Sequence, residues 1–500
     1  MIYNINFGIG WASSGVEYAQ RYRAKIFRDI NVDAKFVFLD FISNENIQTL
    51  TSNMDFQDDE VIWLYQYFTD IKISPTTYTV DNIKESIHGN IIREEQVGKI
   101  LKIIFEGQNN FIACYLKDAD SRVVDRAEFV SNGFLIRKDF YTYVKLFSEY
   151  YAPFDNKAKV YMRTFFNEDG SVAYKEYIDN DNSIFDFPNE KLYSKSEFVG
   201  YFIKALNLTK KDIVILDRAT VIGQAVLQNK GESKVGVVIH AEHYSANFTD
   251  DQYILWNNYY DYQFTQNKHI DFYITATETQ NNLLKQQFHD YKSVKSQIYT
   301  IPVGSIDELK GKDSERQPYS IITASRLASE KHIDWIVQAV VQAQKVLPDI
   351  RLDIYGEGVE KGKIFNIINT HNASSFINLK GHEDLDNVYS QYELFLSGST
   401  SEGFGLTLME AVGSGLGLIG FDVNYGNPTF INSGKNGLLV PYEAGSENHE
   451  ALIQRYADAI IAYYKTINDS AHKESYIIAK NFLTDQVIEK WKGLIEEVQK

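Results

Sequence analysis

The sequence predicts an α/β protein with two successive series of buried strands and helices, and with an antiparallel β-meander inserted into the first series. Short apolar runs, such as residues 235–239 and 394–396, have the length and composition of strands buried in parallel sheets. Loops of small or charged residues follow these runs and lead into helical patterns. Between residues 71 and 187 the pattern changes to short strands joined by turn sequences, which predicts the meander.

Composition limits the function classes. A chain of 500 residues is too long for one core and predicts two or three domains. Its net charge of −17 argues against a broad nucleic-acid footprint or a polybasic membrane face. Cys114 is the only cysteine, which excludes an internal disulfide and a thiolate metal cluster. No secretion signal or run of 18 apolar residues is visible, so we expect a cytoplasmic protein, at most peripheral at the inner face of the membrane.

The domain boundaries follow from these changes in pattern. Residues 1–70 and 190–312 are expected to form the first α/β domain and residues 313–484 the second, with the polar segment 310–318 as linker. The last helix, residues 485–500, has one apolar face and is expected to pack across the domains.

The inserted segment, residues 71–189, is expected to bind a partner or a large acceptor; the alternative is a packed sheet with ordinary core aromatics. Its predicted strands are residues 99–105, 111–116, 123–130, 134–136, 160–166 and 172–178. The aromatics expected at its surface are Phe140, Tyr141, Tyr143, Tyr150 and Tyr151.

The segment around which the chain is organised is residues 397–415, S-G-S-T-S-E-G-F-G-L-T-L-M-E-A-V-G-S-G. This pattern predicts the end of a strand, a loop of small residues and the start of a helix. Free backbone N–H groups at such a helix start can receive an anionic or hydroxyl-rich ligand. Glu402 opens the loop and Glu410 follows about two helical turns later, where both carboxylates can accept hydroxyls of one ligand. The alternative is a solvated turn acid and an ordinary helix-face glutamate.

A second glycine-rich loop, residues 8–15, lies between the first strand (residues 2–7) and the first helix (residues 16–29). Such a loop is a known place for phosphate or sugar. Its spacing differs from the dinucleotide pattern G-x-G-x-x-G, because Ser13 stands where the third glycine should be. A purely structural turn is the alternative.

His240 directly follows the buried strand at residues 235–239, and strand ends of this kind carry ligand sites in open α/β sheets. We therefore expect His240 to contact ligand, with His243 as the weaker candidate. Zinc sites on helices use H-E-x-x-H with a third ligand, and neither is evident here. The D-x-D triplets at residues 118–120, 179–181 and 384–386 are interpreted as turns. No metal and no cofactor are predicted.

Basic residues follow the first strand of the second series. Arg326 and Lys331 lie on this strand-end loop and can supply the fixed positive charge that a diphosphate needs. The alternative is a surface pair bridged to acids. His382 and Glu383 occupy another strand-end loop and could frame a base.

Together, the E-x7-E pair Glu402 and Glu410, the basic pair Arg326 and Lys331, and His240 resemble the retaining family 4 glycosyltransferases, whose GT-B fold has two Rossmann-like domains facing a cleft. Longer stretches, among them N-I-N-F-G-I-G-W-A-S-S-G-V-E-Y-A, H-A-E-H-Y-S and S-R-L-A-S-E-K-H-I-D-W, resemble the GtfA subfamily over nearly the whole chain. Its members are catalytic subunits that, with a GtfB-like partner subunit, add N-acetylglucosamine from UDP-GlcNAc to Ser/Thr-rich adhesins of the accessory Sec system.

This resemblance implies a role for each matching residue. The UDP-binding set would be Gly15, Val16, Glu17, Tyr18, Arg326, Lys331, His382, Glu383 and Glu410, with Glu410 at the ribose and His382 and Glu383 by the uridine. The donor sugar would be held by Glu402, Gly403, Phe404, Gly405, His240 and His243. Glu402, His240, Arg326 and Lys331 would be catalytic, and transfer would retain configuration without a protein nucleophile. Gly417 departs from the family pattern, since relatives usually have proline there, which puts the rigidity of this loop in doubt.

Three alternatives stay open at this point. Wall-teichoic-acid α-glycosyltransferases share the GT-B fold and a similar inserted meander. The donor could be UDP-glucose, because the choice between the two sugars depends on a few pocket contacts of about 1–3 kcal/mol. A non-catalytic adhesin-binding subunit belongs to another class; loss of the glutamates or of the basic pair would favour it, and all four residues are present.

Overall fold

The computed structural model describes residues 1–10, 14–155, 157–311, 315–443, 445 and 448–500. The chain divides into two compact units: unit 1 is Met1–Val237 with Asn258–Ile270, and unit 2 is Val238–Asn257 with Asp271–Lys500. Trp11, Ala12 and Ser13 of the first glycine-rich loop, and residues 312–314 of the predicted linker, lie outside the described residues. The domain boundaries given above stay predictions.

Unit 1 contains a parallel sheet in which the strands β3, β2, β1, β14 and β15 are neighbours in that order. These strands are β1 (Ile2–Asn6), β2 (Ala34–Phe38), β3 (Val61–Trp63), β14 (Ile213–Leu216) and β15 (Lys234–Ile239). Every residue of β14 is buried, as the continuous apolar run I-V-I-L predicts for a central parallel strand. The helices of this unit are α1 (Gly15–Asp29), α2 (Ile47–Ser52), α3 (Leu64–Tyr67), α4 (Val80–Glu85), α5 (Lys195–Ala205), α6 (Gly223–Asn229) and α7 (Asp261–Thr265).

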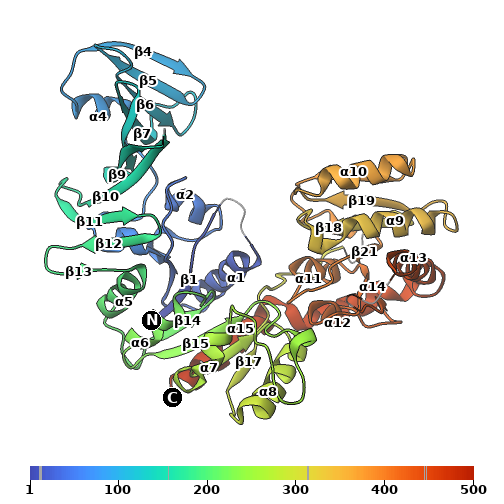
Figure 1. Ribbon diagram of the computed structural model, residues 1–500. Helices are drawn as coiled ribbons and strands as arrows, with labels where there is room; N and C mark the ends of the chain where they lie inside the picture. Colours follow the sequence, from blue (N-terminus) through green and yellow to red (C-terminus); the bar gives the residue numbers. More distant parts are fainter. Residues whose placement is uncertain (11–13, 156, 312–314, 444, 446–447) are drawn as a thin grey trace. The chain divides into compact units, whose positions relative to one another are not determined.

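The predicted meander is confirmed as a ten-stranded antiparallel sheet within unit 1, and its strands follow one another in sequence order (Figure 1). They are β4 (Ile91–Val97), β5 (Ile100–Phe105), β6 (Phe111–Leu116), β7 (Val124–Ser131), β8 (Phe134–Tyr141), β9 (Lys145–Phe154), β10 (Lys157–Phe166), β11 (Val172–Asp179), β12 (Asn182–Asp186) and β13 (Lys191–Leu192). The sequence predicted six of these strands and missed β4, β9, β12 and β13. Each strand pairs with the next through a short turn, so register is set locally.

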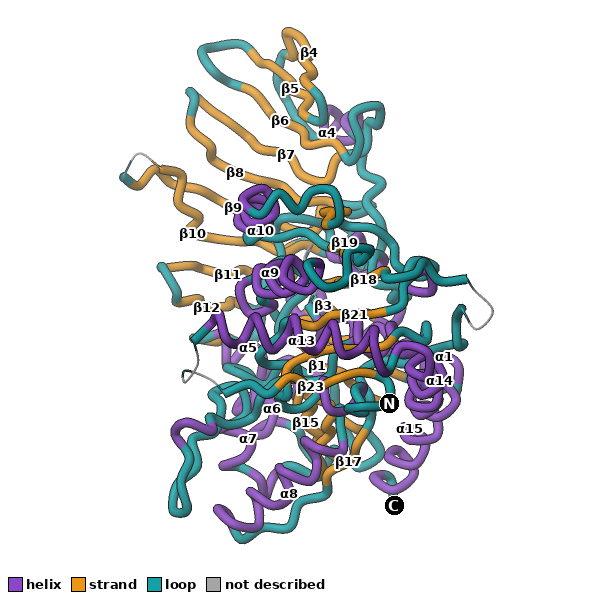
Figure 2. Tube along the Cα trace, turned by 90° about the vertical axis from the view of Figure 1, so that its right-hand side faces the viewer, coloured by secondary structure: helices purple, strands orange, loops and turns teal. Residues whose placement is uncertain are grey.

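The end of this sheet near β4 has its own small core. Val80 and Ile83 of α4 are fully buried together with Ile103 of β5 and Cys114 of β6. Figure 2 shows α4 beside this end of the sheet. Burial raises the pKa of the Cys114 thiol to about 12, so this side chain acts as a small apolar group.

The prediction about surface aromatics is wrong for one of the five. Tyr141 is buried and stacks on Tyr78, whereas Phe140, Tyr143, Tyr150 and Tyr151 are partly exposed. Phe140 stacks on the buried Phe147 with ring centroids 4.3 Å apart. The exposed aromatics of the sheet are instead Phe134, Phe154, Tyr161 and Tyr177. Strand alternation explains the difference, because neighbouring residues point to opposite faces.

Unit 2 contains a six-stranded parallel sheet in the order β20, β19, β18, β21, β22, β23. Its strands are β18 (Ser320–Ala324), β19 (Arg351–Tyr355), β20 (Ile377–Gly381), β21 (Leu394–Ser397), β22 (Gly417–Phe421) and β23 (Gly437–Val440); β16 (Phe272–Thr275) and β17 (Ile298–Thr300) form a further parallel pair. The helices are α8 (Glu278–Lys292), α9 (Ile333–Gln344), α10 (Lys361–Thr370), α11 (Leu406–Gly413), α12 (Gly426–Phe430), α13 (His449–Thr466), α14 (Asn468–Ala479) and α15 (Thr484–Val498).

The last helix, α15, buries the apolar face that the sequence predicts, including Val487, Trp491 and Leu494. Lys490 donates to the backbone carbonyl of Thr300 at 3.2 Å, which ties the helix to β17. Among the described residues, no helix is both long and apolar enough to cross a membrane.

Candidate glycosyl-transfer site

The strand order of unit 2 brings four strand-end loops to one sheet edge, and three of these loops carry predicted site residues. The strands β20, β19, β18 and β21 are parallel neighbours, so their carboxyl ends meet at the same edge, where open α/β sheets bind ligands. The loops that follow them are residues 382–388, 356–360, 325–332 and 398–405. Arg326, Lys331, His382, Glu383 and Glu402 therefore all follow carboxyl ends of neighbouring strands.

Lys331 and Glu402, predicted independently, form an ion pair. The Lys331 Nζ donates to Glu402 Oε2 at 2.7 Å and to Ser399 Oγ at 3.2 Å. Both side chains are about one-fifth exposed, so the pair is partly shielded from water while its charges stay reachable by a ligand. The short loop between β18 and α9 thus presents a fixed cation directly against the loop of small residues.

Arg326 is placed differently. Its side chain is 69% exposed, and the guanidinium donates to Glu330, four residues along the same loop, at 3.0 Å. An exposed pair of this spacing contributes little to stability. The Arg326 side chain can therefore leave Glu330 and turn toward an anion at small cost.

Glu410 lies in α11 with its carboxylate Oε2 accepting a hydrogen bond from the Tyr389 hydroxyl at 3.1 Å. Burial raises the pKa of Glu410 to about 7; the Asp386 and Asp384 charges raise it further, while Tyr389 and Lys310 oppose the shift. A buried carboxyl that changes charge near neutral pH is characteristic of a functional site. The sequence analysis missed Tyr389, which belongs to no recognisable motif.

The loop of small residues is held by its neighbours. The Glu402 carbonyl accepts hydrogen bonds from the Tyr425 and Gly426 N–H groups, each at 2.8 Å. The Phe404 ring is 4% exposed and packs edge-on against Phe430 and Phe482. Phe404 can therefore offer a ligand only its backbone.

His240 follows β15 and lies against this loop. A Cβ added to Gly403 would come within 2.5 Å of the His240 carbonyl oxygen, so glycine is what allows the two backbones to approach this closely. The structure thus brings together two segments that are more than 160 residues apart in the sequence.

His243 is placed inside the protein, with no exposed surface. Its Nε2 lies 2.7 Å from Gln287 Oε1 and its Nδ1 lies 3.2 Å from the Tyr425 hydroxyl. Burial lowers the pKa of His243 to about 4, so the ring is neutral at pH 7. This burial favours a supporting role over direct contact with a sugar.

Tyr425 and Glu242 are site residues that the sequence analysis missed. The Tyr425 hydroxyl donates to Glu242. Burial raises the pKa of Glu242, and this hydrogen bond offsets only part of the increase. Since Tyr425 also holds Glu402 through its backbone, this network connects the strand end at His240 with the loop of small residues.

The predicted contacts of unit 1 begin at α1. Glu17 is 3% exposed, and its carboxylate accepts from the Ser14 N–H at 2.7 Å and from Asn6 at 3.0 Å, with Arg218 at 3.1 Å. Glu17 thus serves as the capping-box residue of the helix. The Val16 N–H donates to the N-cap hydroxyl of Ser14 at 3.3 Å, so the exposed groups that α1 presents are the Gly15 backbone and the partly exposed Tyr18 ring.

His382 and Glu383 are exposed on the loop after β20. Among the described residues, no group of three or more histidine, cysteine, aspartate or glutamate side chains is positioned to hold a metal. That the reaction needs no metal or cofactor stays a prediction.

Gly403→Ala tests the close approach to His240. We expect it to lower the free energy of unfolding by about 1–3 kcal/mol, because the new Cβ must displace backbone, and to reduce transfer by displacing the loop. The control is Gly362→Ala in α10, where nothing lies within 4 Å and a gain of about 0.5–1 kcal/mol is expected. Chemical denaturation measures both; equal stabilisation by the two variants contradicts the assignment.

Comparisons with known proteins agree with this geometry. Residues 93–189 match the model of the GtfA extended beta-sheet domain, and residues 305–468 match that of the glycosyl transferases group 1. The second match contains Arg326, Lys331, His382, Glu383, Glu402 and Glu410.

Full-length relatives are close. A protein of Streptococcus agalactiae, named UDP-N-acetylglucosamine--peptide N-acetylglucosaminyltransferase GtfA subunit, is 52% identical over 98% of this chain and 97% of its own. A more distant relative, the poly(ribitol-phosphate) alpha-N-acetylglucosaminyltransferase of Staphylococcus aureus, is 25% identical over 94% of each chain.

Solved structures give the same result. The crystal structure of the pneumococcal O-GlcNAc transferase GtfA in complex with UDP and GlcNAc superposes with a TM-score of 0.94 at 51% identity, covering 99% of this chain and 98% of that one. A crystal structure of a GtfA/B complex gives 0.95 at 52% identity, covering 100% and 99%. The predicted GT-B fold is thereby confirmed, and the chain belongs to the GtfA family of group 1 glycosyltransferases.

Proposed function

We propose that this chain transfers N-acetylglucosamine from UDP-N-acetylglucosamine to Ser or Thr hydroxyls of a serine-rich polypeptide, with retention of configuration and together with a GtfB-like partner subunit. The observation that carries the proposal is the Lys331 and Glu402 ion pair at the carboxyl edge of a parallel sheet, in a chain 52% identical over its length to a peptide N-acetylglucosaminyltransferase subunit. We further propose that the protein works in the cytoplasm.

In this proposal, Lys331 and Arg326 hold the diphosphate and stabilise the negative charge that develops as UDP leaves. Fixed cations at a departing group lower the barrier because they are oriented before the reaction begins. Glu402 already holds Lys331 in place beside the loop of small residues, whereas Arg326 leaves its weak surface pair when the diphosphate binds, before the transfer step.

The donor sugar is proposed to lie against the loop of residues 402–405. Glu402 accepts sugar hydroxyls, the Gly403, Phe404 and Gly405 backbones line the sugar, and His240 contacts it from the β15 end. His243 positions this segment through Gln287 and Tyr425.

Glu410 is proposed to accept the ribose hydroxyls, with His382 and Glu383 beside the uridine and residues 15–18 as further nucleotide contacts. Hydroxyl donors bind an ionised carboxylate more strongly than a neutral one. The geometry around Glu410 suits this role: among the described residues Tyr389 donates to one carboxylate oxygen, and the remaining lone pairs of the carboxylate can accept ribose hydroxyls.

The pH dependence of UDP binding tests the role of Glu410. Because its pKa is raised to about 7, the carboxyl loses its charge as pH falls through 7, and UDP affinity is expected to fall by up to about tenfold per pH unit below that value. Calorimetric titration between pH 6 and pH 8 measures this. In the Glu410→Gln variant the carboxyl no longer contributes to the pH dependence of UDP affinity, and only the titration of the phosphate remains. Identical pH profiles for the wild-type protein and the variant would count against ribose binding by Glu410.

The function is tested by a transfer assay with UDP-GlcNAc and UDP-glucose as donors. The acceptors are a Ser/Thr-rich peptide and a polyol-phosphate polymer, each with and without the GtfB-like subunit. We expect transfer of GlcNAc to the peptide. Transfer to the polymer alone would support the teichoic-acid alternative, and no transfer to either acceptor with the partner present would refute the enzyme assignment.

A further inference from the structure

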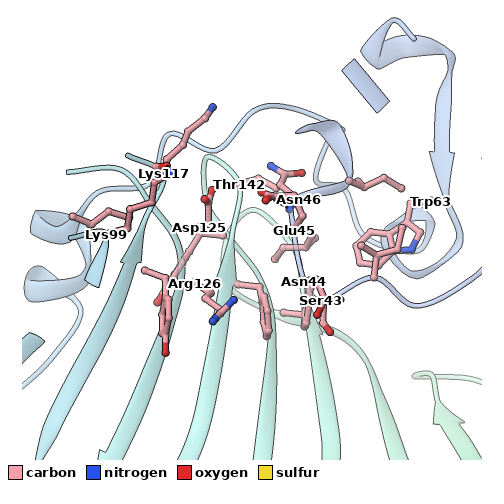
Figure 3. A pocket seen from close by; sticks show the side chains of 18 residues that line it. Ser43, Asn44, Glu45, Asn46, Trp63, Lys99, Lys117, Asp125, Arg126 and Thr142 are labelled. Atoms are coloured by element: carbon pink, nitrogen blue, oxygen red, sulfur yellow. Dashed lines mark hydrogen bonds between the residues drawn. The ribbon is translucent and has the colours of Figure 1, made fainter. Parts of the chain in front are cut away.

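A pocket of about 220 Å³ lies in unit 1 between the segment 42–47 and strands of the antiparallel sheet, and none of the residues assigned above lines it (Figure 3). In this view Asp125 and Thr142 lie between Lys99 and Lys117 on one side and Glu45 and Asn46 on the other. The volume is below the roughly 300–1,000 Å³ of sites for drug-sized ligands, so the pocket suits a single small group.

The pocket wall carries an unsatisfied hydroxyl. Thr142 is 2% exposed, and among the described residues its Oγ1 has no hydrogen-bond partner. Its backbone is fixed, because the Thr142 carbonyl accepts from the Thr77 and Tyr78 N–H groups at 3.1 Å each. A buried hydroxyl without a partner costs free energy, and a ligand that supplies a hydrogen bond recovers it.

Two carboxylates line the same pocket. Burial raises the pKa of Glu45, and the Asp125 charge raises it further. Burial also raises the pKa of Asp125, although a hydrogen bond from Thr76 and the positive charges of Lys117 and Lys99 act to lower it. Partly desolvated carboxylates of this kind are strong acceptors for hydroxyl and amide donors.

Two of the three cations that line the pocket, Lys99 and Arg126, have acidic or aromatic neighbours. Lys99 donates to the Lys117 carbonyl at 2.7 Å and lies 3.5 Å from Asp118, and the Arg126 guanidinium lies 3.8 Å from the Tyr115 ring centroid and 3.6 Å from Glu128. The three cations share the lining with two carboxylates, Glu45 and Asp125, so the pocket lacks the concentrated charge of one sign that a charged ligand would require. The stacked Phe140 and Phe147 add an apolar wall.

A neutral ligand with several hydroxyls and one apolar face matches this combination. We propose that the pocket binds one N-acetylhexosamine unit of an already glycosylated acceptor. The inference rests on the proposed function, because the reaction itself produces such units on the polypeptide. A second sugar site would hold a modified segment while neighbouring hydroxyls are glycosylated, and would raise their effective concentration at the donor site.

The test measures binding directly, with methyl N-acetyl-α-glucosaminide and a Ser-linked N-acetylglucosaminyl peptide as probes. The full chain is saturated with UDP, and Asp125→Asn and Thr142→Val are compared with the control Asp120→Asn, an exposed carboxylate of the adjacent turn that does not line the pocket. We expect roughly tenfold weaker binding or more in each pocket variant and no change in the control.

Stability separates recognition from unfolding. Thr142→Val replaces an unsatisfied hydroxyl with a methyl group of the same shape, so its Tm is expected to be unchanged or higher while probe binding falls. The initial rate of transfer to an unglycosylated peptide is expected to be unchanged in both variants. If the wild-type protein transfers no sugar, the proposed function is wrong, whereas the inference about the pocket is decided by the probe affinities. Unchanged probe affinity in both pocket variants, or stronger binding of an N-acetyl-lysine amide than of the sugar, would overturn the inference.

Discussion

Lys331→Met is expected to reduce the rate of sugar transfer by about 10²–10³-fold. The substitution removes the fixed cation proposed for the departing diphosphate and keeps most of the length of the side chain. Steady-state kinetics with UDP-GlcNAc should show the main loss in kcat, with weaker UDP binding by calorimetry. The charge acts more strongly on the transition state than on bound substrate, because negative charge accumulates as the bond breaks.

The matched control is Lys492→Met. Lys492 also forms an ion pair with a glutamate, Glu489, at 2.9 Å, but on the exposed surface of α15. Its loss should change stability by less than about 1 kcal/mol and leave transfer unchanged. A change of less than threefold in Lys331→Met, with Tm preserved, would remove Lys331 from the site.

Glu402→Gln is expected to abolish measurable transfer, a loss of at least about 10²-fold. The variant keeps the shape of the side chain but removes both the charge that holds Lys331 at 2.7 Å and the strong acceptor proposed for the sugar hydroxyls. UDP affinity is expected to stay equal or to become tighter, because Lys331 no longer shares its charge with a carboxylate. Binding of the GtfB-like partner should be retained.

Glu489→Gln serves as the control for Glu402→Gln, since it breaks the comparable surface pair with Lys492. Transfer assays, UDP calorimetry and co-purification with the partner cover the three expectations. Turnover near the wild-type level would count against Glu402, and loss of partner binding would show that the loop has a wider structural role. In the double variant with Lys331→Met the losses should be less than additive, because the two residues are in contact.

The parts of the fold that the sequence predicted well are those with local signals. Buried parallel strands such as β14 and β21 appear as continuous apolar runs, and the small residues after β21 mark the end of a strand and the start of a helix. Because function in open α/β sheets lies at strand ends, the same signal located most of the candidate site.

The missed strands lack that signal. All seven residues of β4 are exposed, so its sequence I-I-R-E-E-Q-V shows no buried face, and only backbone pairing with β5 makes it a strand. In β9 the buried positions include Ser148 and Glu149, which are satisfied by Asp139 and Arg163. Polar residues at buried positions break the expected alternation of polar and apolar residues.

The missed site residues depend on distant partners. Tyr389 contacts Glu410 across 21 residues, and Tyr425 contacts Glu242 across 183. No spacing in the sequence indicates either pair, since each arises only when the sheet brings separate strand ends together. The burial of His243 and of the Phe404 ring is likewise set by tertiary packing.

The start of β22 shows how a departure from the family pattern is accommodated. The Gly417 N–H donates to the Glu393 carbonyl at 2.9 Å, and the Tyr463 hydroxyl donates to the same oxygen at 3.1 Å. A Cβ at position 417 would lie 2.1 Å from that hydroxyl. Proline at 417 would both lose the N–H and collide with the ring. Positions 417 and 463 are therefore expected to co-evolve, with proline at the first accompanied by a smaller side chain at the second.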